Sequence, residues 1–414
     1  MNLIESMGAN ARIAQKKLRI ASSGDKNKII LNIADELRNS VDEIISANKI
    51  DIDNARSNGI SDTMVDRLLL DEKRINAIAD ACVNITKLPD PVGEIVSGGV
   101  RPNGMKITKV RVPMGVIGII YESRPNVTVD AAVLCIKSGN ATILRGGKEA
   151  IESNKKLAEI MQKAIEKAGF DKNIVSLVSD TSRQIATQMM KANGFIDVLI
   201  PRGGVGLIKS VVENATVPVI ETGTGNCHVF VDSSADEQMA LEIVNNGKTQ
   251  RPSVCNAIES CLVHKDIAES FLPKLQSVFE NHNVEIRGCE KVCKILDNVV
   301  KATDDDFATE FLDYIISIKV VENIDEAIEH IEKYSTGHSE CIVTKSLENA
   351  EKFRQSIDAA AVYVNCSTRF TDGEEFGLGA EIGISTQKLH ARGPMGLREL
   401  TTQKYLIDGN GQIR

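Results

Sequence analysis

The feature that most constrains the fold is the regular alternation of apolar runs and amphipathic segments between Val116 and Ile220. GVIGII, ATILR and FIDVLIP have the length and composition of strands. Between them lie helical patterns, one of which carries Leu157, Ile160 and Ala164 on a single apolar face and ends at Gly169. Because parallel strands need crossover helices, this order predicts right-handed βαβ units and a mostly parallel sheet.

A second α/β series follows, with the strand-like runs CHVFVD, NAIESCLVH, YIISIKVV, ECIVTK and AAAVYVN separated by helical patterns. The first 90 residues are helical in pattern, and residues 94–112 alternate around a Pro-Asn-Gly turn, which predicts a two-stranded arm. A chain of 414 residues is long for a single core. We therefore expect an α/β protein with two parallel-sheet domains and a β arm.

The charge balance excludes some classes of partner. The chain has 49 Lys and Arg residues against 57 Asp and Glu residues, a net charge of −8, which argues against general attraction to nucleic acid or to an anionic membrane. The N-terminal segment has no apolar run of signal-peptide length, and VPMGVIGIIY is too short to cross a bilayer. We expect a cytoplasmic protein whose nine scattered cysteines are reduced.

Cys255 is the candidate nucleophile, since it lies between a predicted helix ending near Lys248 and a predicted strand beginning near Asn256. Ends of strands and helices are where catalytic groups gather. A single cysteine is more often a packing residue, so the segments around Cys255 have to decide between the two interpretations.

Those segments resemble the aldehyde dehydrogenase superfamily. VIETGTGNCHVFVD followed by RPSVCNA is similar to the glutamate and cysteine pair of that superfamily, with Glu221 and Cys255 at matching spacing. Upstream, YESRPNVTVDAAVLCIKSGNATILRGG places Asn126 where the superfamily has an oxyanion-site asparagine, and Arg145 where a basic residue meets the cofactor.

A more specific resemblance is to the gamma-glutamyl phosphate reductases. VENIDEAIEHIEKYSTGHSECIV is similar to the signature of this family, and STRFTDG, FGLGAE and STQKLHARGPMGL also resemble its segments. The matching signature positions are Val321, Ala327, His330, Ile331, Tyr334, Ser335, Thr336, His338, Ser339 and Glu340. The resemblance extends over nearly the whole chain.

The resemblance implies an aldehyde dehydrogenase-like fold and a separate role for each of three parts of the chain. Residues 1–222 are expected to bind NADPH and to carry the arm 94–112, and residues 223–375 to form the catalytic domain with Cys255. Residues 376–414 are expected to be a return segment and C-terminal arm.

The reaction that the resemblance implies is the reduction of L-glutamate 5-phosphate to the 5-semialdehyde through a thioester on Cys255. The side chain of Asn126 and the backbone N–H of Cys255 are expected to hold the oxyanion, although Asn126 is also compatible with a turn role after Pro125. Glu221 has either a proton-relay or pocket-shaping role or a purely structural one at a strand end.

The cofactor prediction is NADPH/NADP, without a GxGxxG fingerprint after a strand. Arg145 can meet a 2′-phosphate, and Gly203, Gly204 and Gly206 in PRGGVG can let backbone approach the phosphates near a helix start. Glu310 resembles the ribose-contacting glutamate of the superfamily, and a solvated surface position is the competing interpretation.

Glutamate 5-phosphate carries a carboxylate and a phosphate, so its pocket needs cationic donors. We expect two of five candidate residues to bind the carboxylate and the phosphate of the substrate. The five candidates are Arg124, Lys248, Arg251, Arg369 and Arg392.

His330 and His338 are interpreted as packing and capping residues. Cys289 and Cys293 have helical spacing but no histidine partner at a standard interval, so no metal site is predicted. The arm and the C-terminal TTQKYLIDGNGQIR are expected to pair across a two-fold axis in a homodimer or dimer of dimers.

Two other functions stay open at this point. One is a hydrolytic NAD(P)-dependent aldehyde dehydrogenase, and the other is a non-catalytic scaffold of the same fold. The small-molecule reaction also makes the upstream glutamate 5-kinase a candidate partner.

Overall fold

The structure of the protein, a computed structural model, describes residues 1–122 and 124–414, with the side chains of residues 62 and 63 outside the description. The chain forms two compact units. Unit 1 comprises Met1–Thr222, Gly377–Gly383 and Met395–Arg414, and unit 2 comprises Gly223–Phe376 and Ile384–Pro394. The tail beyond Phe376 is therefore shared between the units.

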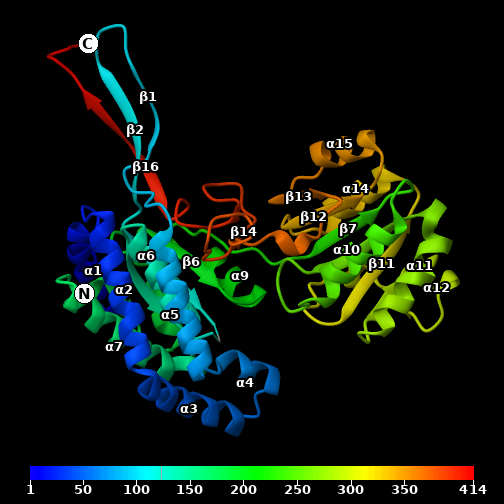
Figure 1. Ribbon diagram of the computed structural model, residues 1–414, viewed down its shortest axis with the longest axis horizontal. Coiled ribbons are helices and arrows are strands. Elements are labelled where there is room, and N and C mark those ends of the chain that lie inside the picture. The colour runs from blue at the N-terminus through cyan, green and yellow to red at the C-terminus, as the bar shows by residue number, and fades with distance from the viewer. Residues whose placement is uncertain (123) are drawn as a thin grey trace. The chain divides into compact units, whose positions relative to one another are not determined.

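Unit 1 begins with five helices and continues as an α/β layer (Figure 1). The helices are α1 (Leu3–Leu18), α2 (Ser23–Asn39), α3 (Val41–Ser57), α4 (Asp62–Leu68), α5 (Glu72–Lys87), α6 (Asn126–Lys137), α7 (Ile151–Lys167), α8 (Arg183–Met190) and α9 (Val205–Asn214), with the 3₁₀ turns Lys148–Ala150 and Lys172–Ile174. The strands are β1 (Ile95–Val100), β2 (Lys106–Pro113), β3 (Val116–Tyr121), β4 (Ala141–Arg145), β5 (Val175–Leu177), β6 (Val198–Arg202) and β16 (Thr401–Asp408).

The core sheet of unit 1 has the order β5-β4-β3-β6, and its strands are parallel. Every residue of β3 is buried, as expected for a strand covered on both faces. Residues of α1, α8 and α9, among them Ile4, Met189 and Val211, join the strands in one apolar cluster. α6 and α7 also contact the strands, and α2 packs against both of them.

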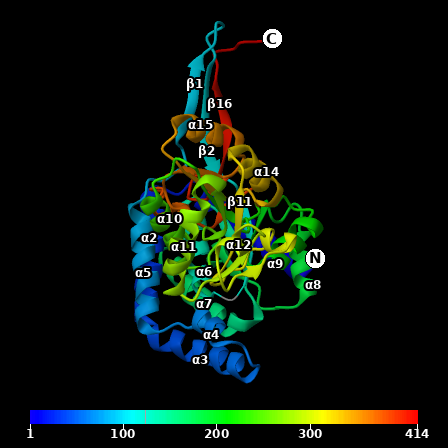
Figure 2. The same ribbon diagram turned by 90° about the vertical axis from the view of Figure 1, so that its right-hand side faces the viewer.

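The arm is a three-stranded antiparallel sheet of order β1-β2-β16 that projects from the rest of unit 1 (Figures 1 and 2). The C-terminal strand thus pairs with β2 of its own chain along its whole length, from Thr401 opposite Pro113 to Asp408 opposite Lys106. Within the chain β2 thus has a neighbour on each side, whereas β1 and β16 are the edges of this sheet. The expected pairing of the arm across a two-fold axis stays a prediction.

Unit 2 is a second α/β layer with a seven-stranded parallel sheet of order β10-β9-β11-β8-β7-β12-β13. Its strands are β7 (Cys227–Val231), β8 (Ile258–His264), β9 (Glu285–Gly288), β10 (Val300–Lys301), β11 (Ile315–Val321), β12 (Ser339–Val343) and β13 (Ala361–Val364), and the tail adds the pair β14 (Ile384–Ser385) and β15 (Gly393–Pro394). Its helices are α10 (Glu237–Thr249), α11 (Lys265–Glu280), α12 (Val292–Ile295), α13 (Asp304–Phe307), α14 (Ile324–Tyr334) and α15 (Leu347–Ser356), with a 3₁₀ turn at Thr368–Phe370.

Two apolar clusters build the core of unit 2. One joins α10, α11 and α12 to the strands through residues such as Val244, Phe271 and Val292. The other joins α14 and α15 to alternate residues of the same strands, among them Phe230 and Ile342. Successive strand residues point to opposite faces, so the two clusters lie on the two sides of the sheet.

The expected fold class, two parallel-sheet α/β layers with a β arm, is confirmed. One expected strand is reduced: TVPVIE forms only an isolated bridge between Val219 and Leu199 instead of a regular strand. In the described part of the chain, no helix has the length and apolarity needed to cross a membrane.

Gly118 generates a test of the packing in unit 1. A Cβ at this position would stand 2.5 Å from Leu199 Cδ2 and 2.8 Å from Met189 Cε. Since overpacking a core typically costs about 1–3 kcal/mol, Gly118→Ala should lower the free energy of unfolding by that amount in a denaturant titration. Gly99→Ala, whose Cβ would meet nothing within 4 Å, is the control. Equal stability of the two variants would contradict this packing.

Candidate active site

Cys255 lies in the turn between α10 and β8, at the amino end of the unit 2 sheet. The two strands next in order, β7 and β12, begin at Cys227 and Ser339, close to the same edge. Cys255 is half-buried, and all nine cysteines are reduced thiols. Cys255 thus differs from the fully buried cysteines of the core, as a nucleophile must.

Two contacts fix the carbonyl group of Cys255. The Cys227 thiol donates a hydrogen bond to this oxygen at 3.2 Å. The Cα of Gly225 packs so closely that an added Cβ would stand 1.4 Å from the oxygen and 2.3 Å from the carbonyl carbon. Only glycine fits at this position, so the conformation of the Cys255 turn depends on Gly225.

The segment that carries Gly225 is itself held by hydrogen bonds within unit 2. The N–H of Gly225 donates to Glu310 Oε1 at 2.7 Å, and the N–H of Asn226 donates to Thr336 Oγ1 at 3.0 Å. Burial raises the pKa of Glu310, and the Gly225 N–H opposes that rise. One oxygen of Glu310 therefore has a structural partner close to Cys255.

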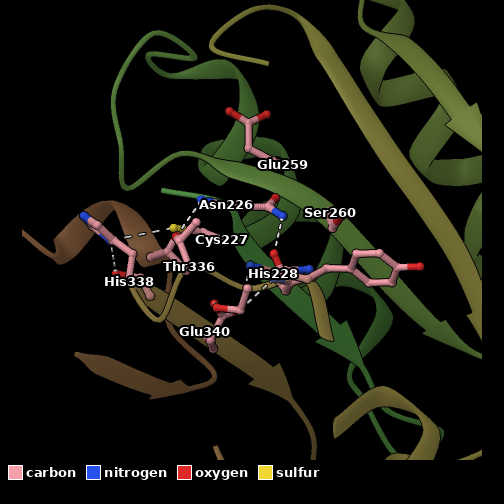
Figure 3. Close-up of polar contacts among 12 residues, drawn as sticks. Asn226, Cys227, His228, Glu259, Ser260, Thr336, His338 and Glu340 are labelled. Atoms are coloured by element: carbon pink, nitrogen blue, oxygen red, sulfur yellow. Dashed lines mark hydrogen bonds and ion pairs between the residues drawn. The ribbon is translucent and has the colours of Figure 1, made fainter. Parts of the chain in front are cut away.

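A polar network begins at Cys227, and Figure 3 shows its first contact, with His338. Cys227 Sγ is 3.7 Å from His338 Nδ1, which is 2.9 Å from Ser339 Oγ. Ser339 Oγ is in turn 2.6 Å from Thr371 Oγ1. Burial lowers the pKa of His338 to about 4, so the ring is neutral at neutral pH. The network orders the turn and carries no charge to the thiol.

The other signature residues are also structural. Glu340 Oε2 accepts hydrogen bonds from the N–H and Nδ1 of His228 at 2.8 and 3.0 Å, and both side chains are fully buried (Figure 3). Ser335 Oγ donates to the second oxygen of Glu340. The His330 ring packs on Phe307 and its pKa is lowered to about 2 by burial. These contacts fix the start of β7, where Cys227 lies.

Two predicted cations lie near Cys255 in unit 2. Burial lowers the pKa of Arg369, the charge of Arg251 lowers it further, and a negative charge on Cys255 opposes both effects. Arg369 is half-buried and its Nε donates to Gln250 at 3.0 Å, whereas Arg251 is exposed. The charge of Arg369 thus interacts with a negative charge on Cys255.

Two other predicted cations have structural partners. Lys248 is fully buried, with its Nζ 2.6 Å from Glu259 Oε2 and 3.1 Å from the carbonyl oxygen of Ile258. An ammonium group that is fully buried and paired in this way cannot meet a substrate, so we remove Lys248 from the substrate set. Arg392 is paired with Asp358, through a 2.7 Å ion pair and a 2.9 Å hydrogen bond to its carbonyl oxygen.

Unit 1 holds Asn126 at the first position of α6, after the carboxyl end of β3. Asn126 Nδ2 donates to Asp130 Oδ2 at 2.9 Å, one helical turn along. An amide group has two N–H donors, and the second has no partner among the described residues, so it can serve a ligand. Burial raises the pKa of Asp130 to about 6, and Asn126 and Arg202 oppose that rise.

Glu221 and Arg124 are half-buried at the same edge of unit 1. Arg124 follows β3 by three residues, and Glu221 follows the bridge that joins Val219 to Leu199 of β6. The next residue, Thr222, donates its hydroxyl to the carbonyl oxygen of Pro201 at 2.8 Å. Carboxyl ends of parallel strands are where open α/β sheets bind ligands.

Arg145 ends β4 at this edge. Its Nη2 donates to the carbonyl oxygen of Thr181 at 2.5 Å, and its Nε is buried without a hydrogen-bond partner among the described residues. Burial lowers the pKa of Arg145, and the charges of Glu149, Glu122 and Asp180 oppose that effect. The orphaned Nε fits a cofactor oxygen, whereas three carboxylates around the guanidinium weaken its attraction for an anion.

The glycines of PRGGVG lie at the start of α9, with Gly204 at the N-cap. Glu122 Oε2 accepts the N–H of Gly204 at 2.9 Å, and a Cβ on Gly203 would stand 2.4 Å from the same oxygen. A Cβ on Gly206 would meet nothing within 4 Å. The open backbone and the helix start fit a dinucleotide phosphate. The N–H of Gly204 is already donated to the carboxylate of Glu122.

Sequence reasoning missed Glu122, Asp130 and Cys227. Each acts through a contact with a residue that sequence reasoning did identify: Gly204, Asn126 and Cys255 respectively. Only the pair Asn126 and Asp130 has a sequence signal, the i,i+4 spacing on a helix. The other two contacts join residues distant in the chain.

Within the described residues, no three or more His, Cys, Asp or Glu side chains are grouped to hold a metal ion. Cys293 Sγ donates to the carbonyl oxygen of Gly288 at 3.3 Å, and the N–H of Val320 donates to Cys289 Sγ at 3.4 Å. Both thiols thus have backbone partners.

The family model described as "Aldehyde dehydrogenase family" matches residues 2–291 and 294–405. The gamma-glutamyl phosphate reductase of Caldanaerobacter subterraneus subsp. tengcongensis is 56% identical over 411 residues, 99% of each chain. The protein of the same name from Clostridium botulinum (strain Alaska E43 / Type E3) is 57% identical over 414 residues, 100% of each chain.

The chain is also similar to solved structures. The gamma-glutamyl phosphate reductase of Thermotoga maritima has a TM-score of 0.98 and 52% identity, covering 100% of both chains. An acetylating aldehyde dehydrogenase from Geobacillus thermoglucosidasius has a TM-score of 0.72 at 18% identity, covering 99% of this chain and 97% of that one, which shows a shared fold alone.

The buried ion pair of Lys248 generates a stability prediction. Lys248→Ala leaves Glu259 buried without its partner, so the free energy of unfolding should fall by about 3–5 kcal/mol in a urea titration. Lys345→Ala, which breaks an exposed pair with Asp236, is the matched control and should cost less than about 1 kcal/mol. A Lys248→Ala variant of normal stability and raised substrate KM would return Lys248 to the substrate site.

The Gly225 contact generates a prediction about reactivity. Gly225→Ala must displace the Cys255 peptide, and displacements of about 1 Å cost catalysis about 10²-fold. We expect kcat to fall by about that factor, and the rate of Cys255 alkylation by iodoacetamide to change. Gly24→Ala, which meets only Ser22 Oγ at 3.6 Å, should leave both rates unchanged. Normal kcat in Gly225→Ala would refute the contact.

Proposed function

The chain belongs to the aldehyde dehydrogenase family and, within it, to the gamma-glutamyl phosphate reductases, and we propose that it reduces L-glutamate 5-phosphate to L-glutamate 5-semialdehyde in proline biosynthesis. The observation that carries the proposal is identity of 56–58% to proteins of that name over the whole chain. The half-buried thiol of Cys255, held at a strand edge, supplies the nucleophile.

Cys255 acts as its thiolate. The sulfur attacks the acyl carbon, a C–S bond forms, and the C–O bond to the phosphoryl group breaks with release of inorganic phosphate. The enzyme uses a nicotinamide cofactor, which when bound supplies the hydride that reduces the thioester. Arg369, whose charge interacts with a negative charge on Cys255, favours the thiolate.

The oxyanion of the tetrahedral intermediate needs donors, and we assign the N–H of Cys255 and the amide of Asn126 to this role. A thiol of ordinary pKa near 8.5 is about 3% ionised at pH 7, so full ionisation gains only about thirtyfold. One oxyanion donor is typically worth about 10²–10³ in kcat. The geometry of these donors therefore matters more than the pKa of the thiol, and Asp130 orients the Asn126 amide.

Glu221 has a different role here from that in a hydrolytic enzyme. Activation of water would hydrolyse the thioester and waste the activated acyl group. We therefore assign to Glu221 a proton relay or the shaping of the nicotinamide pocket, at the carboxyl edge of the unit 1 sheet.

The proposed cofactor is NADPH. Arg145, with its orphaned Nε, is assigned to the 2′-phosphate, and the backbone of Gly203, Gly204 and Gly206 to the diphosphate. Glu310 keeps its assignment to a ribose hydroxyl through the carboxylate oxygen that Gly225 does not use.

The substrate anions are assigned to Arg251 and Arg369, since these lie near Cys255. Arg124 stays a candidate, and Arg392 would first have to release Asp358. Lys248 is excluded by its burial.

The arm supports a proposed homodimer or dimer of dimers. Tyr405 and Ile407 on β16 and Ile95 and Val100 on β1 are 60–71% exposed, which is unusual for large apolar side chains grouped on one sheet. We place the enzyme in the cytoplasm, where an upstream glutamate 5-kinase is a candidate partner.

The two alternatives differ in one observable. A hydrolytic aldehyde dehydrogenase oxidises the semialdehyde without inorganic phosphate, whereas the proposed enzyme needs phosphate or arsenate to release the acyl group. A non-catalytic scaffold does neither.

The experiment supplies glutamate 5-semialdehyde and NADP and follows nicotinamide absorbance. We expect steady turnover only with phosphate or arsenate, and Cys255→Ser should lower it at least about 10³-fold because the nucleophile is lost. Cys293→Ser, at another half-buried thiol, is the matched control and should keep normal turnover. Phosphate-independent turnover would favour the hydrolytic alternative, and unchanged activity in Cys255→Ser would exclude the thioester.

A further inference from the structure

Arg202 is an unassigned cation at the ligand-binding edge of unit 1. It is the last residue of β6 and lies opposite Tyr121, the last residue of β3. Its side chain is half-buried, yet among the described residues it makes no side-chain hydrogen bond and no ion pair within 4.0 Å. Its carbonyl oxygen accepts the N–H of Glu122 at 3.1 Å, so the position of its backbone is fixed.

The tail packs against this guanidinium. Gly383 has a φ of +150°, and a Cβ there would stand 2.7 Å from Thr222 Cγ2 and 3.3 Å from Arg202 Nη1. The segment around Gly383 is tied to unit 1 by the N–H of Met395, which donates to the carbonyl oxygen of Gly383 at 2.8 Å. A side chain at residue 383 would occupy the space that Arg202 uses.

Asp130, a carboxylate on which the charge of Arg202 acts, does not form an ion pair with it. Asp130 Oδ2 is bonded to Asn126 Nδ2 at 2.9 Å. Arg202 therefore lies beside the Asn126 and Asp130 pair with its positive charge uncompensated at that side.

A guanidinium that has no partner among the described residues favours an oxyanion as its ligand. Removing a charge from water is costly unless it is paired, and arginine presents five N–H donors in a planar fork that matches phosphate or carboxylate oxygens. Arg202 is partly exposed and its guanidinium has no hydrogen-bond or ion-pair partner among the described residues, so it is open to an external oxyanion.

We propose that Arg202 binds a phosphate-class oxyanion of the reactants at the carboxyl edge of β6. The inference rests on the proposed function, which supplies two such oxyanions: the phosphoryl group of the substrate and the diphosphate of the dinucleotide. Both have the same chemistry, and binding measurements distinguish them.

The experiment measures binding by calorimetry to the full-length protein in the absence of turnover. Inorganic phosphate and NADP are titrated separately into the wild type, Arg202→Met and Arg202→Lys. We expect Arg202→Met to weaken one of the two ligands about 10- to 100-fold, as loss of a charged hydrogen-bonding group does, and Arg202→Lys to weaken it less.

The control is Arg12→Met, because Arg12 is also partly exposed but its guanidinium is paired with Asp197 at 2.8 Å, next to the amino end of β6. This variant should bind both ligands as the wild type does. Thermal melts establish that each variant is folded. Should Arg202→Met fail to fold, Arg202→Lys alone decides, since it keeps the charge and loses the planar fork.

Weaker phosphate binding with normal NADP binding identifies the phosphoryl group of the substrate, and the reverse identifies the diphosphate. Normal binding of both ligands in a folded Arg202 variant overturns the inference. Failure of the proposed function has a separate signature, because wild-type protein without phosphate-dependent turnover can still show oxyanion binding that depends on Arg202.

Discussion

The contact between Gly225 and the carbonyl group of Cys255 is the constraint on which the proposed chemistry depends. No Cβ can be placed at residue 225, so the backbone of residues 224–226 lies directly against the turn that carries the thiol. Glu310, Thr336 and the Cys227 network hold that backbone in place. Thr336, His338 and Ser339 of the signature segment thus help to support this turn.

Much of the fold could be predicted from the sequence because its signals are local. Runs such as GVIGII and ECIVTK are buried strands, and the patterns between them are helices. Where the local signal was weak, the prediction was less good: TVPVIE has strand composition but forms a single bridge to Leu199. The pairing of β16 with β2 joins residues 288 to 302 positions apart, and no local pattern indicates it.

The sequence could predict those site residues whose side-chain type and motif indicate a chemical role. Cys255 and Asn126 follow from their motifs, but Lys248 was predicted to be a ligand cation because it comes shortly before Cys255. The structure pairs it with Glu259 in the interior, since its position on α10 faces β8. Glu122, Asp130 and Arg202 are assigned roles because of the residues that they contact in the folded chain, at one edge of the sheet. Their spacing in the sequence does not reveal these contacts.

The proposed reaction passes through an acyl group that is covalently bound to the sulfur of Cys255. Incubation of the enzyme with glutamate 5-semialdehyde and NADP, without phosphate, should stop after one turnover. Intact-mass analysis followed by peptide mapping should then find a glutamyl group on the peptide that contains Cys255, removable by added phosphate. A glutamyl adduct on another cysteine, or steady turnover with no adduct at all, would contradict the account.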